Sequence, residues 1–156
     1  MSVRHAEPAD FEEICAMLLA HADHEGGEMT LHRDELHTTL FGPHRVGRAL
    51  IASPEGSSET AGCALWYPTF STWASRRGIW LEDLYVKPGY RRHGLGRELL
   101  AFLRSLTTGR VEWDVSHGNT SAEAFYQALG AGPVGGWTRY RWAPTTGEPG
   151  FGLVDA

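Results

Sequence analysis

The order of strand-like and helix-like segments predicts an α/β (α+β) fold, in which a mixed β-sheet carries helices on both faces. Two observations predict it. Short apolar runs of strand length alternate with longer segments of helical periodicity, and a strand, a glycine turn and a helix follow one another in mid-chain. The chain has 156 residues, of which 42% are hydrophobic. We therefore expect a single domain over residues 1–156 with a packed core.

The N-terminal part is expected to form an edge strand and two helices. Residues 2–6 have the pattern of a short strand, and Pro8 suits the first turn of the helix that follows. The apolar face of that helix consists of Phe11, Ile14, Cys15, Leu18, Leu19 and Ala22. Residues 23–30 are polar and predict a loop, and residues 31–41 predict a second, weaker helix that stops at a Gly-Pro pair.

Three strands are expected in the middle of the chain. Residues 48–53 and 61–67 are the first two, and a hairpin-like connection joins them. Residues 68–77 contain aromatic side chains and are expected to form a loop. Residues 78–86 are largely apolar and predict the central strand of the sheet.

The C-terminal part is expected to alternate helix and strand. Residues 97–106 predict a helix with one apolar face, and residues 110–115 predict the next strand. Asn119 can cap a further helix, which Gly130 would end. Residues 137–142 alternate in character and predict a final strand, so that the complete order is βααβββαβαβ.

The connection between the central strand and its helix has the properties of an anion-binding turn. Residues 86–96 read Val-Lys-Pro-Gly-Tyr-Arg-Arg-His-Gly-Leu-Gly. The glycines allow a sharp turn and a close approach of the backbone to a ligand, and the first N–H groups of a helix have no partner within it. Arg91, Arg92 and His93 add basic groups, so the expected ligand is a phosphate or pyrophosphate. The turn lacks the Lys-Ser or Lys-Thr ending of a P-loop, and the dinucleotide fingerprint fits poorly.

The phrase that begins at Val86, Val-x-Pro-x-Tyr-Arg-x-x-Gly-Leu-Gly-x-x-Leu-Leu, resembles the acetyl-CoA-binding motif of the GNAT family of N-acetyltransferases. The resemblance implies the GNAT fold, acetyl-CoA as co-substrate, and direct transfer of the acetyl group to an amine. The cofactor-binding residues that it implies are Leu84, Tyr85, Val86, Arg91, Arg92, His93, Gly94, Leu95, Gly96, Arg97, Asn119 and Ala122.

Tyr126 is the candidate general acid for the departing thiolate. It lies in Asn-x-x-Ala-x-x-Phe-Tyr-x-x-Leu-Gly-Ala, residues 119–131, which resembles the fourth motif of the GNAT family. The alternative is a core tyrosine packed beside Phe125 and Leu129. Asn119 likewise has two competing roles, as helix cap and, by resemblance, as a group that binds the pantetheine arm.

Glu82 is the candidate catalytic and substrate-binding carboxylate. Glu82 and Asp83 interrupt an apolar strand, where acidic residues are costly to bury, and alternation is expected to place them on opposite faces. The surrounding Leu-Glu-Asp-Leu-Tyr-Val and the upstream Tyr-Pro-Thr-Phe-Ser-Thr-Trp resemble the diamine (spermidine/spermine) acetyltransferase branch, in which the matching glutamate contacts the amine. The resemblance places His24 and Glu25 on the substrate loop, and Asp114 is a further candidate for binding a cationic substrate. His24 and Gly135 depart from that branch, which usually has a tyrosine and an acidic residue there.

The composition of the chain limits the classes of binding partner and the cellular compartment that we expect. The formal net charge of −5 argues against non-specific nucleic-acid binding, and no apolar run is long enough to span a membrane. Cys15 and Cys63 are expected to be buried thiols of a cytoplasmic protein rather than a disulfide. Histidines and acidic residues gather between residues 21 and 32 without zinc-site spacing, so no metal is expected.

The leading hypothesis is an N-acetyltransferase for a primary amine of a small cationic molecule, such as a polyamine, a diamine or an amino-acid-like amine. An acetyltransferase of protein N-termini or lysines and a non-catalytic acyl-CoA-binding module are the alternatives. A homodimer is expected, because Trp73, Trp137 and Trp142 are candidates for exposed aromatic surface and because dimers are usual in the GNAT family.

Overall fold

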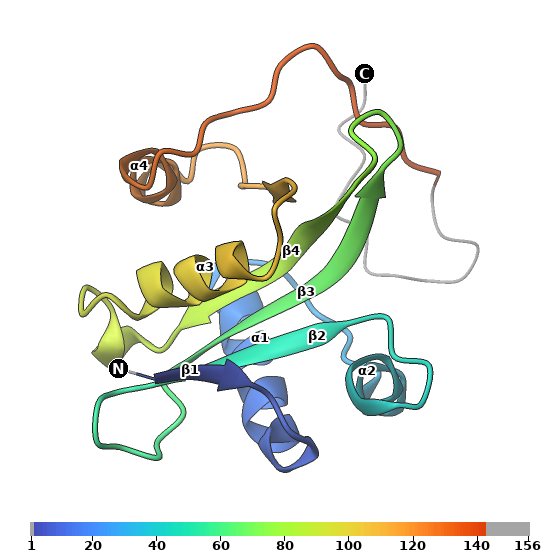
Figure 1. Ribbon diagram of the computed structural model, residues 1–156. Helices are drawn as coiled ribbons and strands as arrows, with labels where there is room; N and C mark the ends of the chain where they lie inside the picture. The colour runs from blue at the N-terminus through green and yellow to red at the C-terminus, as the bar shows by residue number, and fades with distance from the viewer. Residues whose placement is uncertain (1, 143–156) are drawn as a thin grey trace. The chain divides into compact units, whose positions relative to one another are not determined.

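A computed structural model describes residues 2–142 of the chain. The chain divides into two compact units, Met1–Trp113 and Asp114–Ala156, and each is described here by itself. The first unit contains the β-sheet, three of the α-helices and the glycine turn, and the second contains helix α4 (Thr120–Ala128) (Figure 1).

The sheet has five strands in the order β1-β2-β3-β4-β5. The strands are β1 (Ser2–His5), β2 (Arg48–Ser53), β3 (Gly62–Ser71), β4 (Arg76–Val86) and β5 (Val111–Glu112). Neighbouring strands from β1 to β4 run antiparallel, and β5 runs parallel to β4. The sheet is therefore mixed, as the sequence predicts.

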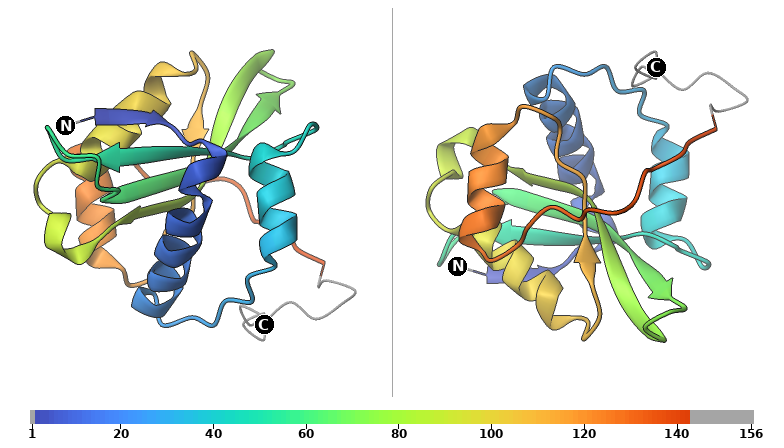
Figure 2. Two further views of the ribbon diagram at one scale, coloured as in Figure 1. Left: turned by 90° about the horizontal axis from the view of Figure 1, so that it is seen from below. Right: turned by 90° about the horizontal axis from the view of Figure 1, so that it is seen from above.

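Helices cover both faces of this sheet, which confirms the predicted fold class (Figure 2). A short 3-10 turn (Pro8–Asp10) leads into α1 (Phe11–His24), and α1 and α2 (Arg33–Phe41) cover one face. Helix α3 (Leu95–Ser105) covers the other face.

Strict alternation along the strands builds a separate hydrophobic core on each face. On β2, Ile51 packs into the core beneath α1 and α2, whereas Leu50 packs into the core beneath α3. Both side chains are fully buried. Cys15 and Cys63 are buried free thiols, as expected, and Cys63 belongs to the α1 side.

Four expectations for the secondary structure need correction. Residues 68–77 were expected to form a loop, but β3 and β4 continue through most of this segment as a long hairpin, with pairs as far as Ser71↔Arg76. Pro68 is tolerated there because it lies beyond the last β2–β3 pair, Arg48↔Trp66, where β3 has one neighbouring strand in the sheet. Apolar and β-branched side chains in this segment favour the strand.

The other corrections concern element ends. Helix α3 begins at Leu95 and not at residue 97, because the left-handed Gly94 turns the chain directly into the helix. The strand expected over residues 110–115 is shortened to Val111–Glu112. The final strand expected over residues 137–142 is not formed, and residues 137–142 lie outside any helix or strand. A strand is stable only beside another strand. The alternation of residue types in one segment does not show whether such a neighbour exists, so it predicted a strand that is not formed.

Candidate active site

The glycine turn between β4 and α3 has the backbone geometry of an anion site. A 3-10 turn (Pro88–Tyr90) follows β4, and Arg92 and Gly94 then adopt left-handed conformations with φ of 65° and 89°. The first hydrogen bond of α3 runs from the N–H of Glu98 to the carbonyl of Gly94. The N–H groups of the preceding helical residues have no acceptor within the helix, and the helix dipole adds positive potential at the same place.

The side chains of the turn divide into two groups. Arg91 is held by the protein, because its Nε donates to the carbonyl of Val86 at 2.9 Å and its guanidinium lies 5.6 Å from the ring centroid of Tyr85. Arg92, His93 and Arg97 are exposed. The turn therefore presents three basic side chains beside the helix N-terminus, and Arg91 fixes the turn to the end of β4.

The end of β4 that leads into this turn has an open edge. β5 pairs with β4 at Ile79 and Trp80 only, whereas β3 pairs with β4 as far as Val86. Within the first unit, residues 81–86 of β4 therefore have a strand on one side only. The backbone of this stretch is available for hydrogen bonds to an extended ligand, which fits the expected roles of Leu84, Tyr85 and Val86.

The side chains of these cofactor-binding candidates belong to the core. Tyr85 packs on the α1 side, and Leu84 and Val86 pack against the cluster beneath α3. Leu95 is buried within the α3 cluster. Any contact of these residues with a ligand would be made by their backbone, and Gly96 adds a residue without a side chain in the first turn of α3.

A β-bulge brings the two acidic residues of β4 to the same face. Asp83 pairs with Leu65 and Leu81 pairs with Trp66, so Glu82 is an extra residue without a partner on β3. The indole Nε1 of Trp80 donates to Glu82 Oε2 at 2.9 Å, which places Glu82 on the side opposite Leu81. The expectation that Glu82 and Asp83 lie on opposite faces was wrong, because it assumed an unbroken two-residue period.

Asp83 lies on the α1 face as well, where it approaches a histidine of that helix. Its Oδ1 is 3.9 Å from Nε2 of His21, and the rings of His21 and Tyr85 are 5.7 Å apart. The Nδ1 atom of His21 is buried and has no hydrogen-bond partner within residues 2–142. Glu82, by contrast, is exposed. The bulge thus creates one half-buried and one exposed carboxylate, side by side.

Burial controls the ionisation of this group. Burial and, next, the negative charge of Glu82 raise the pKa of Asp83 to about 6, from an ordinary value of 3.8. Burial also lowers the pKa of His21. Both shifts favour the neutral forms, so the contact between His21 and Asp83 is not a strong ion pair. A carboxyl group that titrates near pH 6 is suited to accept a proton under neutral conditions.

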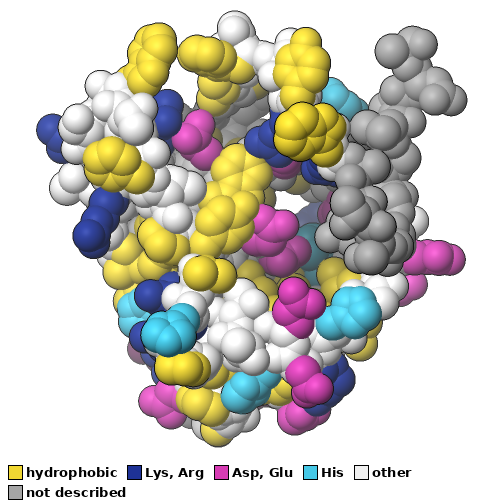
Figure 3. Space-filling view, turned by 90° about the vertical axis from the view of Figure 1, so that its right-hand side faces the viewer, with side chains coloured by type: hydrophobic (Ala, Val, Ile, Leu, Met, Phe, Trp, Pro, Cys, Tyr) yellow, Lys and Arg dark blue, Asp and Glu magenta, His cyan; other side chains and the backbone are white. Residues whose placement is uncertain are grey.

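The remaining substrate-binding candidates lie in different places. His24 is the last residue of α1 and Glu25 is its C-cap, and both are exposed one turn beyond His21. Asp114 belongs to the second unit, where its carboxylate forms an ion pair with Arg139. A space-filling view shows acidic side chains gathered near the middle of one face, among hydrophobic ones (Figure 3).

The second unit contains Tyr126, Asn119 and Ala122. Asn119 caps α4, as expected, because its Oδ1 accepts from the N–H of Ala122 at 3.1 Å. Tyr126 is half-buried, with its ring 5.2 Å from that of Phe125. Gly130 ends the helix with φ of 84°. The roles of Tyr126 and Asn119 toward a cofactor stay predictions.

Sequence reasoning missed His21 and gave Asp83 a secondary role. A signal for His21 was present, because it follows Met17 and Leu18 at helical spacing and so falls on the buried face of α1. No comparable signal exists for the bulge. An extra residue in one strand changes the side of every later residue without changing the local composition.

The family described as "Acetyltransferase (GNAT) family" matches residues 12–131. The chain belongs to the GNAT family. It is therefore an N-acetyltransferase, and the resemblance seen in the glycine turn is confirmed.

Relatives of this acetyltransferase include enzymes that act on small amines. Thialysine N-epsilon-acetyltransferase of Sus scrofa is 28% identical over 161 residues, which cover 90% of this chain and 91% of that enzyme. The spermidine/spermine N(1)-acetyltransferase-like protein 1 of Homo sapiens is 32% identical over 67% of this chain, but over only 16% of its own length. L-ornithine N5-acetyltransferase of Arabidopsis thaliana is 36% identical, and this match covers 46% of this chain and 33% of that enzyme. These relatives agree with the predicted diamine acetyltransferase-like branch.

Solved structures confirm the fold of this acetyltransferase. An aminoglycoside acetyltransferase from an uncultured soil metagenomic sample superposes with a TM-score of 0.72 at 14% identity, over 92% of this chain and 96% of that one. An integron cassette protein of V. cholerae superposes with a TM-score of 0.75 at 18% identity, over 92% and 93% of the two chains. No helix among residues 2–142 has both the length and the apolar character that a membrane crossing requires.

Proposed function

We propose that this GNAT enzyme uses acetyl-CoA to acetylate a primary amine of a small cationic molecule. The observation that carries the proposal is the carboxylate pair of Glu82 and Asp83, which lies on β4 directly before the anion-binding turn. The relatives that acetylate ornithine and thialysine support an acceptor with more than one charged group. A polyamine or an amino-acid-like amine has this character.

The residues of the first unit fit the binding of acetyl-CoA. The N–H groups at the start of α3, with Arg92, His93 and Arg97 around them, would hold the pyrophosphate. The open edge of β4 from Leu84 to Val86 would bind the pantetheine amides through its backbone. When bound, acetyl-CoA supplies an acetyl thioester that an amine can attack directly.

The carboxylate pair would perform two tasks for the acceptor. An alkyl ammonium has an ordinary pKa of about 10.4, so only about one molecule in a thousand is neutral near pH 7. Glu82, exposed and oriented by Trp80, would attract the cation. Asp83, half-buried beside it and with its pKa raised to about 6, would accept the proton that the ammonium must lose. Glu25 and His24, at the end of α1, would contact the distal part of the acceptor.

Tyr126 would act as the general acid for the departing thiolate. This role rests on the sequence motif of residues 119–131. Tyr126→Phe removes one hydroxyl and little volume, and is expected to lower kcat by about 10- to 10⁴-fold with a small change in KM. A variant with wild-type turnover would leave Tyr126 as a packing residue.

A thiol-release assay with acetyl-CoA tests the proposed function directly. The acceptor panel would include spermidine, 1,3-diaminopropane, ornithine, thialysine, a lysine-containing peptide and a neutral-ended monoamine. We expect turnover with the small dicationic acceptors and the lowest kcat/KM with the neutral-ended one. Gly94→Val, which forces a β-branched residue into the left-handed region, is expected to abolish acetyl-CoA binding measured by calorimetry. Turnover of the peptide alone would contradict the proposal.

We also propose that the enzyme is a homodimer. Trp73, Trp137 and Trp142 are 92%, 78% and 98% exposed. Large exposed aromatic side chains are typical of interaction surfaces, so we expect the surface of a second subunit to cover them. Light scattering at micromolar concentrations would measure the mass, and a value equal to the 17.2 kDa of one chain would contradict the dimer.

A further inference from the structure

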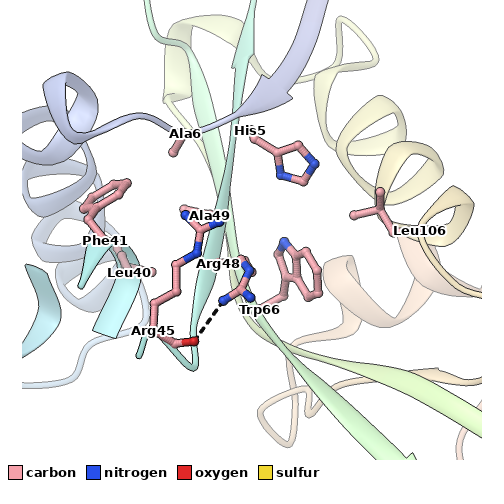
Figure 4. A pocket seen from close by; sticks show the side chains of 9 residues that line it. All are labelled: His5, Ala6, Leu40, Phe41, Arg45, Arg48, Ala49, Trp66 and Leu106. Atoms are coloured by element: carbon pink, nitrogen blue, oxygen red, sulfur yellow. Dashed lines mark hydrogen bonds between the residues drawn. The ribbon is translucent and has the colours of Figure 1, made fainter. Parts of the chain in front are cut away.

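A hollow lies at the edge of the sheet, on a part of the first unit that the proposed acetyl transfer does not use. Strand β1 ends with the pair His5↔Leu50, so Arg48 at the start of β2 has a neighbouring strand on one side only. The hollow lies where β2 extends beyond the end of β1, and its volume is about 370 Å³. Figure 4 shows His5, Trp66 and Leu106 on one side of it and Phe41 on the other.

Two arginines supply positive charge to this hollow without a matching carboxylate. Arg48 is half-buried, and its Nη1 donates to the carbonyls of Arg45 and Gly47 at 3.2 and 2.9 Å. Those bonds fix one nitrogen of the guanidinium and leave its other donors for a ligand. Arg45 is exposed. Among residues 2–142, neither arginine has a carboxylate within ion-pairing distance.

A tryptophan supplies an unsatisfied donor and a flat apolar wall. Nε1 of Trp66 is buried and has no hydrogen-bond partner within the described residues. Figure 4 shows this nitrogen turned toward the interior of the hollow. A buried donor without an acceptor is uncommon in folded proteins and is satisfied when a ligand supplies an oxygen. Phe41 and Leu106 complete apolar walls around it.

We propose that this hollow is a binding site for a small organic anion with a flat apolar body. The anionic group would lie against Arg45 and Arg48, and one of its oxygens would accept from Trp66 Nε1. Planar carboxylates and phosphates match the fork of guanidinium donors, and the aromatic walls favour an unsaturated body.

The proposed anion site is separate from the carboxylate pair. The hollow spans the edge of the sheet at the start of β2, with Trp66 packed against the cluster beneath α3 and Phe41 against the cluster beneath α1 and α2. Glu82 and Asp83 belong to β4, and β3 separates that strand from β2. The charge of the two sites is also opposite. A ligand of the hollow would therefore be an additional effector or a second small molecule, and not the cationic acceptor.

Nuclear magnetic resonance of the indole N–H groups tests this proposal. The chain has six tryptophans, and the signal that disappears in Trp66→Phe identifies Trp66. Benzoate would be titrated first, and its neutral isostere benzamide second; phenyl phosphate would show whether a phosphate is preferred to a carboxylate. We expect the chemical shift of the Trp66 indole N–H to change saturably with benzoate or phenyl phosphate and to stay constant with benzamide.

Matched variants separate a specific site from general charge effects. Arg45→Gln is expected to weaken benzoate binding by about tenfold, since charge-assisted hydrogen bonds contribute most of the attraction. Arg33→Gln removes the same charge at the opposite end of α2 and is expected to leave binding unchanged. Leu106→Trp fills the hollow from an exposed position and is expected to abolish binding without unfolding the chain.

Three results would overturn the proposal. The first is an unchanged chemical shift of the Trp66 indole N–H at millimolar benzoate and phenyl phosphate. The second is an equally large shift change with benzamide. The third is equal affinity for benzoate in the Arg45→Gln and Arg33→Gln variants. Because none of these measurements involves acetyl-CoA or an amine, their outcome is independent of the proposed acetyltransferase substrate.

Discussion

The two faces of β4 serve different purposes, although they belong to one strand. From Ile79 onward the face toward α3 is apolar, and its residues are Ile79, Leu81, Leu84 and Val86. The face toward α1 carries Glu82 and Asp83 between Trp80 and Tyr85. The first face is packed as an ordinary core, and the second contains a half-buried carboxyl group of a kind that an apolar core excludes.

The β-bulge at Glu82 makes this difference possible. Without the extra residue, Asp83 would follow Leu81 on the same face and would enter the apolar cluster beneath α3. With it, both carboxylates lie on the α1 side, and Leu84 and Val86 still pack toward α3. One irregular residue therefore separates a stabilising surface of β4 from the surface that carries the carboxylates.

The largest effect is expected from the stabilising face. Leu103 of α3 is fully buried in the cluster that covers this face, two turns beyond the first turn of the helix. Leu103→Ala is expected to lower the free energy of unfolding by about 2–5 kcal/mol, because it removes buried methyl groups and leaves a cavity. Urea denaturation measures this loss. The kcat/KM of the folded enzyme should change little. A large loss of turnover with unchanged stability would show that the α3 face takes part in catalysis.

The sequence predicts most of the fold because the core periodicities are regular. The strand 48–53 and most of the apolar face of α1 were placed correctly from residue types alone. On α1, Leu19 was expected in the core but is exposed, and the buried Met17 was not included. The final strand, residues 137–142, was not, since a strand needs a neighbour and alternation does not identify one.

The candidate site was predictable only in part. The glycine turn has a local sequence pattern, and the structure places left-handed residues there as expected. The contact of His21 with Asp83 joins residues 62 positions apart, and it depends on a bulge that no local pattern marks. Sequence reasoning therefore found the acidic residues but assigned their faces wrongly.

Asp83→Asn gives the next largest effect, and it changes stability and turnover in opposite directions. The pKa of Asp83 in the folded protein, about 6, lies above the ordinary value of 3.8, so the folded state binds more protons between these values. The contribution of Asp83 to stability is therefore most favourable below about pH 4 and becomes less favourable as the pH rises to 6. Asparagine, which mimics the protonated form, should raise the free energy of unfolding at pH 8 by up to about 3 kcal/mol.

The same substitution is expected to lower kcat by about 10²- to 10⁴-fold, because the proton acceptor is lost. Urea denaturation at pH 4 and pH 8 and turnover with the best acceptor of the panel are the measurements. Near pH 4 the stabilities of the variant and the wild type should agree. A variant that is less stable than the wild type by the same amount at both pH values would show that Asp83 has a structural role.

Glu82→Gln is expected to have the smallest effect, because this carboxylate is exposed. An exposed ion pair contributes about 0.2–1 kcal/mol, so kcat/KM for a dicationic acceptor should fall by about 1.4- to 5-fold, and less for a monocation. Removing the like charge lowers the pKa of Asp83, so the acid limb of the pH–rate profile should move to lower pH. Trp80→Phe, which removes the donor to Glu82 but keeps both charges, is the matched control and should leave that limb in place. If Glu82→Gln instead abolishes turnover while the acid limb stays fixed, Glu82 is the proton acceptor. The half-buried carboxyl group of Asp83 would then have no part in catalysis.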